Sequence, residues 1–185
     1  MMRKAYGKSW GTGRNVMSNG SDTHPWMMKI ITKSPFVKES DSDGESFWSI
    51  EVEDPATNRT VRTSISPYAL LHSLGEERGE QELFTCGCGV AECARIYHER
   101  FECTEKFVHW IFEEMGTDYS LFFDRIAYET SAIEMFHDIY VTKDGWDFNS
   151  CEYCSYEEFK AEVDEFLSAK PRFKAIWDEI EENKR

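Results

Sequence analysis

Polar and hydrophobic residues alternate in two neighbouring stretches of the chain, residues 47–53 and 60–65. In the first stretch a tryptophan, an isoleucine and a valine lie between polar neighbours. A period of two is typical of a strand that buries one face. The intervening residues 54–58 include Asp, Pro and Asn, which favour turns, so the pattern predicts a β-hairpin.

Four further segments are predicted to be strands: residues 82–86, 94–101, 106–112 and 121–128. Residues 106–112 are apolar on both alternating faces. This pattern predicts a central strand that is covered on each side.

Two helices are predicted in the middle of the chain. Ser66 followed by Pro67 is typical of a helix start, and Gly75 is typical of its end. Ser131 with Glu134 matches a capping box, and apolar residues follow at helical spacing.

The C-terminal third of the chain is predicted to form a pair of helices. Ser155 with Glu158 again matches a capping box, and Pro171 is suited to the first turn of a second helix. The apolar stripes of the two helices are Phe159, Val163, Phe166 and Leu167, and Phe173, Ile176, Trp177 and Ile180. Such stripes are typical of core packing.

Together these elements predict an α+β fold. We expect a mainly antiparallel sheet of about five strands, with helices packed on it and a C-terminal helical pair. The 185 residues are enough for one domain with a hydrophobic core. We assign this domain to residues 28–185, and we expect a flexible basic tail over residues 1–27, which are rich in Gly, Ser and Asn and lack periodicity.

The chain is acidic, with a formal net charge of −14, and the charge is unevenly distributed. Residues 1–38 contain seven Lys or Arg and one acidic residue. Residues 39–185 contain fourteen Lys or Arg and thirty-four acidic residues. The excess of carboxylates disfavours contact between the folded part and the phosphate backbone of nucleic acids. It suits a basic protein partner or nucleic-acid mimicry, and it is also compatible with an ordinary solvated surface.

No segment has the pattern of a membrane span or of a secretory signal. No apolar run approaches the roughly 20 residues that a span needs, and the basic N-terminus is not followed by an apolar core. We therefore expect a cytoplasmic protein without membrane contact, whose six cysteines are reduced or bind a metal.

Three cysteines, Cys86, Cys88 and Cys93, lie within eight residues together with two glycines. Their position between two predicted strands places them in the loop of a further hairpin. Zinc binds four thiolates or imidazoles, and tight loops commonly supply such ligands, so we predict a structural zinc ion at these three residues. The candidates for the fourth ligand are Cys103, His98, His109, Cys151 and Cys154.

Two alternatives for these cysteines stay open, because C-x-C-x4-C is not a standard zinc pattern. The cysteines can be unreactive thiols at strand ends, or they can take part in redox or nucleophilic chemistry. The neighbouring Glu82 and Glu92 are expected to raise the thiol pKa, which disfavours a reactive thiolate there. Cys154 is better placed for such chemistry, because it directly precedes a predicted helix start.

The segment from Phe84 to Ala94, followed by Val108-His109-Trp110, resembles a set of small uncharacterised bacterial proteins. Those proteins have a Cys-x-Cys-Gly loop, a third cysteine, and then a strand that ends in a tryptophan. The resemblance extends over residues 46–140. It implies one fold for this stretch and a bacterial or phage origin, and it implies no activity.

The composition predicts a small, non-enzymatic interaction protein that binds a basic partner, of the toxin-neutralising or inhibitor type. The sequence contains no nucleophile elbow, phosphate-binding loop or dinucleotide fingerprint, so we predict no catalytic residue. One alternative is a thiol- or metal-dependent enzyme that uses Cys86, Cys88 and Cys93. The other is contact with nucleic acid through the basic N-terminal arm, residues 1–38.

Overall fold

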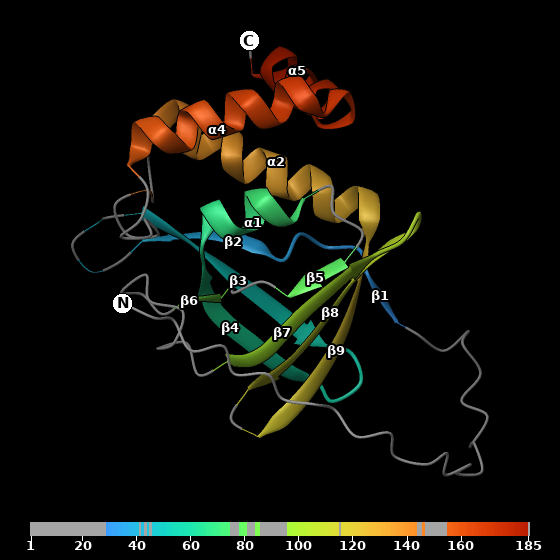
Figure 1. Cartoon of the computed structure of the whole chain (residues 1–185). Helices are drawn as coiled ribbons and strands as arrows, with labels where there is room; N and C mark the ends of the chain where they lie inside the picture. The colour runs from blue at the N-terminus through green and yellow to red at the C-terminus, as the bar shows by residue number, and fades with distance from the viewer. Residues whose placement is uncertain are drawn as a thin grey trace, which may run out of the picture.

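The chain folds into sheets and helices of the α+β class that its sequence predicts (Figure 1). The computed structural model describes residues 29–40, 42, 44, 46–74, 78–80, 84–85, 96–114, 116–143, 146 and 155–184, with only the backbone for residues 78–80, 84–85 and 96–99. The expectations for the tail at residues 1–27 and for Gly75 lie outside these residues.

The strands form two sheets rather than one sheet of about five strands. The five-stranded sheet consists of β1 (Ile30–Ile31), β9 (Thr117–Asp124), β8 (Phe107–Glu114), β7 (Ile96–Cys103) and β5 (Arg78–Glu80), in that order. The four-stranded sheet consists of β2 (Phe36–Ser40), β3 (Ser46–Asp54), β4 (Arg59–Ile65) and β6 (Phe84–Thr85). Among the strand pairs that the structure describes, only β1 and β9 pair in parallel, so both sheets are mainly antiparallel, as expected.

The predicted hairpin is confirmed as β3 and β4, with Val52 opposite Val61. Its turn is fixed by Asp54, whose carboxylate accepts hydrogen bonds from the amide of Ala56 at 2.9 Å and from the hydroxyl of Thr57 at 2.6 Å. Asn58 completes the turn with a φ of 55°, a left-handed conformation that asparagine tolerates well.

Strand β8 lies in the middle of the five-stranded sheet, as the apolar pattern of residues 106–112 predicts. One face carries Val108, Trp110 and Phe112, which are buried. The opposite face carries Phe107 and His109, which are half-buried. The strand is therefore fully covered on one side only.

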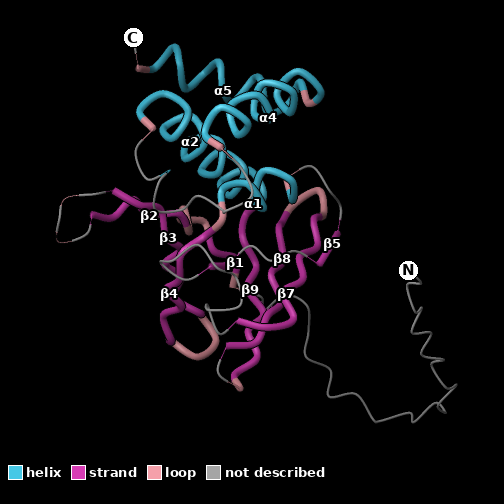
Figure 2. The backbone as a smooth tube through the Cα atoms, turned by 60° about the vertical axis from the view of Figure 1, so that its left-hand side comes forward, coloured by secondary structure: helices cyan, strands magenta, loops and turns pink. Residues whose placement is uncertain are grey.

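Four helices of the described part of the chain form a layer on one side of the sheets (Figure 2). They are α1 (Pro67–Ser73), α2 (Arg125–Thr142), α4 (Tyr156–Ala169) and α5 (Pro171–Asn183). Helix α2 contacts β2, β8 and β9 on one side and α5 on the other. The buried residues of the sheets and helices belong to one continuous core.

The start of α2 differs from the prediction. Strand β9 ends at Asp124, and this carboxylate caps the helix by accepting a hydrogen bond from the amide of Ala127 at 2.9 Å. Ser131 lies inside the helix and donates to the carbonyl of Ala127 at 2.7 Å. The predicted capping box at Ser131 and Glu134 is therefore wrong. The strand predicted over residues 121–128 is confirmed for residues 121–124, which belong to β9, and wrong for residues 125–128, which begin α2. A serine inside a helix can bond to the preceding turn, so the sequence motif alone did not define the start.

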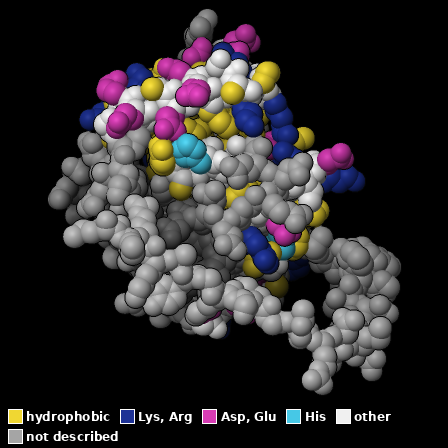
Figure 3. Space-filling model, in the orientation of Figure 1, with side chains coloured by type: hydrophobic (Ala, Val, Ile, Leu, Met, Phe, Trp, Pro, Cys, Tyr) yellow, Lys and Arg dark blue, Asp and Glu magenta, His cyan; other side chains and the backbone are white. Residues whose placement is uncertain are grey.

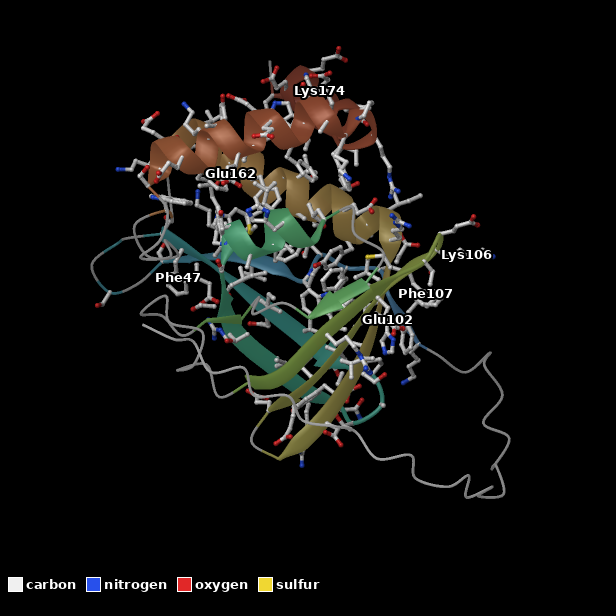
Figure 4. The ribbon with its side chains drawn as sticks, viewed as in Figure 1. Phe47, Glu102, Lys106, Phe107, Glu162 and Lys174 are labelled. Atoms are coloured by element: carbon white, nitrogen blue, oxygen red, sulfur yellow. The ribbon has the colours of Figure 1, made fainter. Side chains whose placement is uncertain are left out.

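The predicted C-terminal helical pair is confirmed. Ser155 and Glu158 form the capping box, in which the Ser155 amide donates to the Glu158 carboxylate at 2.8 Å. Pro171 lies in the first turn of α5, and the predicted apolar stripes face the core. Glu162 ties α4 to α1, because it accepts from the hydroxyl of Tyr68 at 3.2 Å and lies 2.9 Å from His72 Nε2 (Figure 4).

Among the helices that the structure describes, none combines the length and the apolar character that crossing a membrane requires.

The two candidate starts of α2 can be separated by mutation. We expect Asp124→Ala to lower the free energy of unfolding by about 1 kcal/mol, because it removes the helix cap. Glu134→Ala should change it by less than about 0.5 kcal/mol, because Glu134 is exposed in the middle of the helix. Urea unfolding followed by circular dichroism measures both, and the opposite ranking would contradict the observed helix start.

Candidate functional site

The structure does not bear on the cysteines themselves, but it places the strands on either side of them. Cys86, Cys88 and Cys93 lie outside the described residues. Strand β6 pairs with β4 in one sheet, through Phe84 opposite Ile65, whereas β7 pairs with β5 and β8 in the other. The prediction that the cysteines occupy a hairpin loop is therefore wrong, and the segment that contains them connects the two sheets.

Two of the candidates for the fourth zinc ligand lie at the wrong end of β7. The cysteine segment enters β7 at Ile96, whereas Cys103 ends the strand and His109 lies opposite its penultimate residue. A strand of 8 residues spans roughly 20 Å, and Cys93 lies at most about 11 Å from Ile96 along the chain. We therefore discard Cys103 and His109 as ligands to the same ion.

His98, Cys151 and Cys154 stay as candidates, because the structure does not describe their side chains. Within the described residues, no group of three or more His, Cys, Asp or Glu side chains could hold a metal ion.

His109 has a structural environment of its own. Its Nε2 lies 2.8 Å from the hydroxyl of Ser120, and its ring stacks on Phe122 with 3.9 Å between centroids. Burial lowers the pKa of the imidazole, although the nearby Glu102 opposes this shift. Such an environment is typical of a packed histidine.

A buried carboxylate joins α2 to α5. Glu129 is almost fully buried and forms ion pairs with Arg125, at 2.9 Å, and with Arg172. Arg125 also donates to the backbone carbonyl of Thr104, next to Cys103. These contacts fix the start of α5 against the first turn of α2.

The thiol of Cys103 lies near these arginines but is not activated. Burial raises its pKa, and the positive charges of Arg125 and Arg172 only partly oppose this effect. A raised pKa keeps the thiol protonated at neutral pH, so Cys103 is a poor nucleophile.

The outer surface of the helical layer carries more acidic than basic side chains. Residues 155–184 contain nine acidic and five basic side chains. Four of the basic residues have internal partners: Arg172 pairs with Glu129, Lys174 pairs with Asp178, Lys160 lies 4.5 Å from the ring centroid of Tyr140, and Lys184 Nζ lies 3.2 Å from His137 Nδ1. Figure 3 shows Asp and Glu side chains crowded over this layer.

Several carboxylates of this layer point into solvent. We define the acidic helical surface as Glu157, Asp164 and Glu165 of α4 and Glu179 and Glu182 of α5, all of which are exposed. Apart from Asp164, no hydrogen bond or ion pair with another described residue holds their carboxylates. The surface can therefore offer its negative charge to a partner.

A groove of about 470 Å³ lies between α4 and α5, next to α2. Its floor contains Tyr140, Leu167 and Trp177, and its rim contains two carboxylates, Asp164 and Glu181. The remaining lining residues are Ser168, Pro171 and Lys174. The groove thus combines an apolar floor with a largely acidic rim.

The aromatic floor orients both carboxylates of the rim. The hydroxyl of Tyr140 donates to Asp164 at 3.1 Å, and the indole Nε1 of Trp177 donates to Glu181 at 3.2 Å. Burial and the hydrogen bond to Asp164 raise the pKa of the Tyr140 hydroxyl, with a smaller contribution from Glu181. Asp164 and Glu181 therefore both raise the pKa of the same tyrosine.

The sequence did not reveal this groove. Trp177 was assigned to a core stripe, and Tyr140, Asp164 and Glu181 had no distinguishing pattern. The alternation of apolar and acidic residues in the two C-terminal helices was the available signal, but it does not indicate which residues of different helices meet.

No family model, curated protein or solved structure matches this chain. The candidate site is therefore defined by its geometry and charge alone.

The ion pairs of Glu129 predict a difference in stability. Glu129→Ala removes the buried carboxylate that Arg125 and the half-exposed Arg172 share, and should lower the free energy of unfolding by about 1.5–3 kcal/mol, because charge-assisted hydrogen bonds are lost. Asp178→Ala removes the exposed pair with Lys174 and should cost less than about 0.5 kcal/mol. Denaturant unfolding compares the two variants, and equal costs would show that the buried pairs do not fix the helical layer.

Proposed function

We propose that the protein is a non-enzymatic interaction protein that binds a basic protein partner through the acidic helical surface. The observation that carries this proposal is the excess of exposed carboxylates on α4 and α5, where four of the five basic side chains have internal partners. Complementary charge accelerates association and disfavours partners of the same sign. A surface of this kind suits neutralisation of a basic toxin or inhibition of a basic host factor.

Lysozyme, a small basic protein, is a suitable first probe for the proposed surface. We expect it to bind at low ionic strength and to bind more weakly at about 150 mM salt, because salt screens exposed charges beyond roughly 8 Å. The variant Glu165→Lys/Glu179→Lys/Glu182→Lys should weaken binding by about tenfold or more, because it reverses three charges on the surface. Isothermal titration calorimetry measures these affinities.

The matched control is Glu53→Lys/Glu105→Lys/Asp118→Lys. It changes the net charge of the chain by the same amount, but at exposed positions on strands and turns. We expect it to weaken binding by less than about threefold, because its charges lie away from the contact. Equal losses in both variants would mean that only total charge matters, and this would contradict a defined surface.

Residues 86–93 add a second part to the proposal, a structural zinc ion held by Cys86, Cys88 and Cys93. It is supported by three thiols within eight residues, in a segment that connects one sheet to the other. A metal in this connection would stabilise the fold by tying the sheets together.

We expect elemental mass spectrometry to find about one zinc per chain in protein purified without chelator. The variant Cys88→Ser should lose the metal and unfold at a lower temperature, whereas Cys103→Ser should keep it. Metal-free wild-type protein, or a Cys88→Ser variant that keeps its full metal content, would refute this part of the proposal.

The alternative functions depend on residues outside the described part of the chain. Thiol- or metal-dependent chemistry would use Cys86, Cys88 and Cys93, and nucleic-acid contact would use the basic N-terminal arm. Of the cations of this arm, the structure describes Lys33, which is exposed, and two others: Lys29 donates to the carbonyl of Pro55 at 2.9 Å, and Lys38 pairs with Asp138 at 2.8 Å. These two cations have partners within the chain, so the observations favour the acidic helical surface.

A further inference from the structure

We infer that the groove between α4 and α5 accepts one lysine side chain of the basic partner. The inference rests on the proposed function, because it names the chemical group of the basic partner that would bind in this groove. Its basis is the combination of an apolar floor and two oriented carboxylates in one groove.

The floor of the groove suits the hydrocarbon stem of a lysine. Leu167 and Trp177 are buried beneath it, and Tyr140 is half-buried beside them. Lysine commonly packs its four methylene groups along apolar surface and keeps its ammonium group near water or a counter-ion. A short apolar floor that is open to solvent offers this arrangement.

The rim supplies the counter-ions from two different helices. Asp164 belongs to α4 and Glu181 to α5, and each accepts a hydrogen bond from the aromatic floor. An ionised carboxylate has about four acceptor positions, so the bond from Tyr140 leaves Asp164 with capacity for an incoming donor. The groove therefore presents two held negative charges that need no reorganisation before the ammonium group arrives.

The one cation among the described residues that line the groove, Lys174, already has a partner on its own helix. Lys174 projects from α5 (Figure 4) and forms an ion pair with Asp178, one helical turn further along. This pairing reduces its repulsion toward an incoming ammonium group without removing it. Lys174 is thus expected to weaken binding slightly.

The geometry favours lysine over arginine. A guanidinium group binds best to a single carboxylate in a planar, bidentate manner, or stacked on an open aromatic face. Trp177 is only 5% exposed, so its ring offers no open face. A compact ammonium group with three donors is better suited to two carboxylates that come from different helices.

The chain itself contains an example of this chemistry beside the groove. Lys160 of α4 lies 4.5 Å from the ring centroid of Tyr140 and 5.6 Å from that of Tyr156. A lysine of the chain therefore already packs on the tyrosine whose hydroxyl holds Asp164.

The test uses capped pentapeptides of sequence Gly-Gly-X-Gly-Gly, in which X is lysine, arginine or norleucine. They are titrated into the full-length, ¹⁵N-labelled chain at low ionic strength, and the indole N–H signal of Trp177 is followed by NMR. We expect the lysine peptide to shift this signal in a saturable manner. The arginine peptide should bind at least about threefold more weakly, and the norleucine peptide should cause no saturable shift.

Three variants test the assignment of the rim. Asp164→Asn/Glu181→Gln should weaken lysine-peptide binding by about tenfold, because it removes both counter-ions but keeps their shape. Lys174→Met should strengthen binding by about twofold, because it removes the local positive charge. The matched control, Glu157→Gln/Glu179→Gln, also removes two charges, but outside the groove, and should weaken binding by less than about twofold.

The outcomes separate this inference from the proposed function. If lysozyme binds through the acidic helical surface but the lysine peptide leaves Trp177 unshifted, the lysine site is refuted and the proposed function stands. Norleucine binding as tight as lysine binding would show an apolar groove without charge recognition and would also refute the site. Arginine binding that equals or exceeds lysine binding would overturn the selectivity, and absence of both lysozyme and peptide binding would refute both proposals.

Discussion

Helix α2 is buried between the strands on one side and α5 on the other, and the position of the whole helical layer depends on this packing. Ile133, Met135, Phe136 and Ile139 are each at most 1% exposed. Burial of such side chains stabilises a fold by about 1.5–3 kcal/mol each. These residues do not lie on a single narrow stripe of the helix. Helix α2 can therefore pack against the strands with one side and against α4 and α5 with another.

Helices α4 and α5 are attached to α2 by contacts of different kinds. Phe136 packs against Phe159 of α4, His137 and Tyr140 pack against Trp177 of α5, and Glu129 pairs with Arg172. Burial of one face leaves the other faces of α4 and α5 in solvent, where the sequence places mainly carboxylates. Like charges on one surface repel each other and oppose the compact state, and a basic partner would relieve this repulsion. The buried contacts thus hold α4 and α5 in place although the like charges on their surface oppose the compact state. The same charges would favour association with a basic partner.

The same contacts produce the groove. Tyr140 is the last large aromatic residue of α2, and it reaches the space between α4 and α5, where its hydroxyl holds Asp164. Trp177 packs edge-on against Tyr140, with 5.3 Å between the ring centroids, and holds Glu181. Rings that pack the layers together therefore also orient the carboxylates that face solvent.

Local sequence signals predicted the elements whose structure is decided locally. The hairpin β3–β4 followed from alternation and turn residues, and the start of α4 followed from the capping box of Ser155 and Glu158. The start of α2 could not be predicted in the same way. Asp124 ends a strand and caps a helix without a break, and Ser131 imitates a cap within that helix.

Features that depend on contacts between distant segments were not predictable from these patterns. Alternation shows which face of a strand is buried but not which strand it pairs with, so the division into two sheets and the separation of β6 from β7 were missed. The acidic character of the chain was evident from its composition. The groove was not, because its carboxylates lie 17 residues apart on separate helices and are brought together only by the floor that α2 supplies.

The central claim is that a basic protein binds to α4 and α5, and the most direct measurement is the footprint of such a protein on the chain. The ¹⁵N-labelled chain is titrated with unlabelled lysozyme at low salt, and the backbone amide shifts are mapped onto the structure. The account predicts shifts concentrated on α4 and α5, with β3, β4 and β8 unchanged. Shifts concentrated on the strands, or spread evenly over the surface, would contradict it.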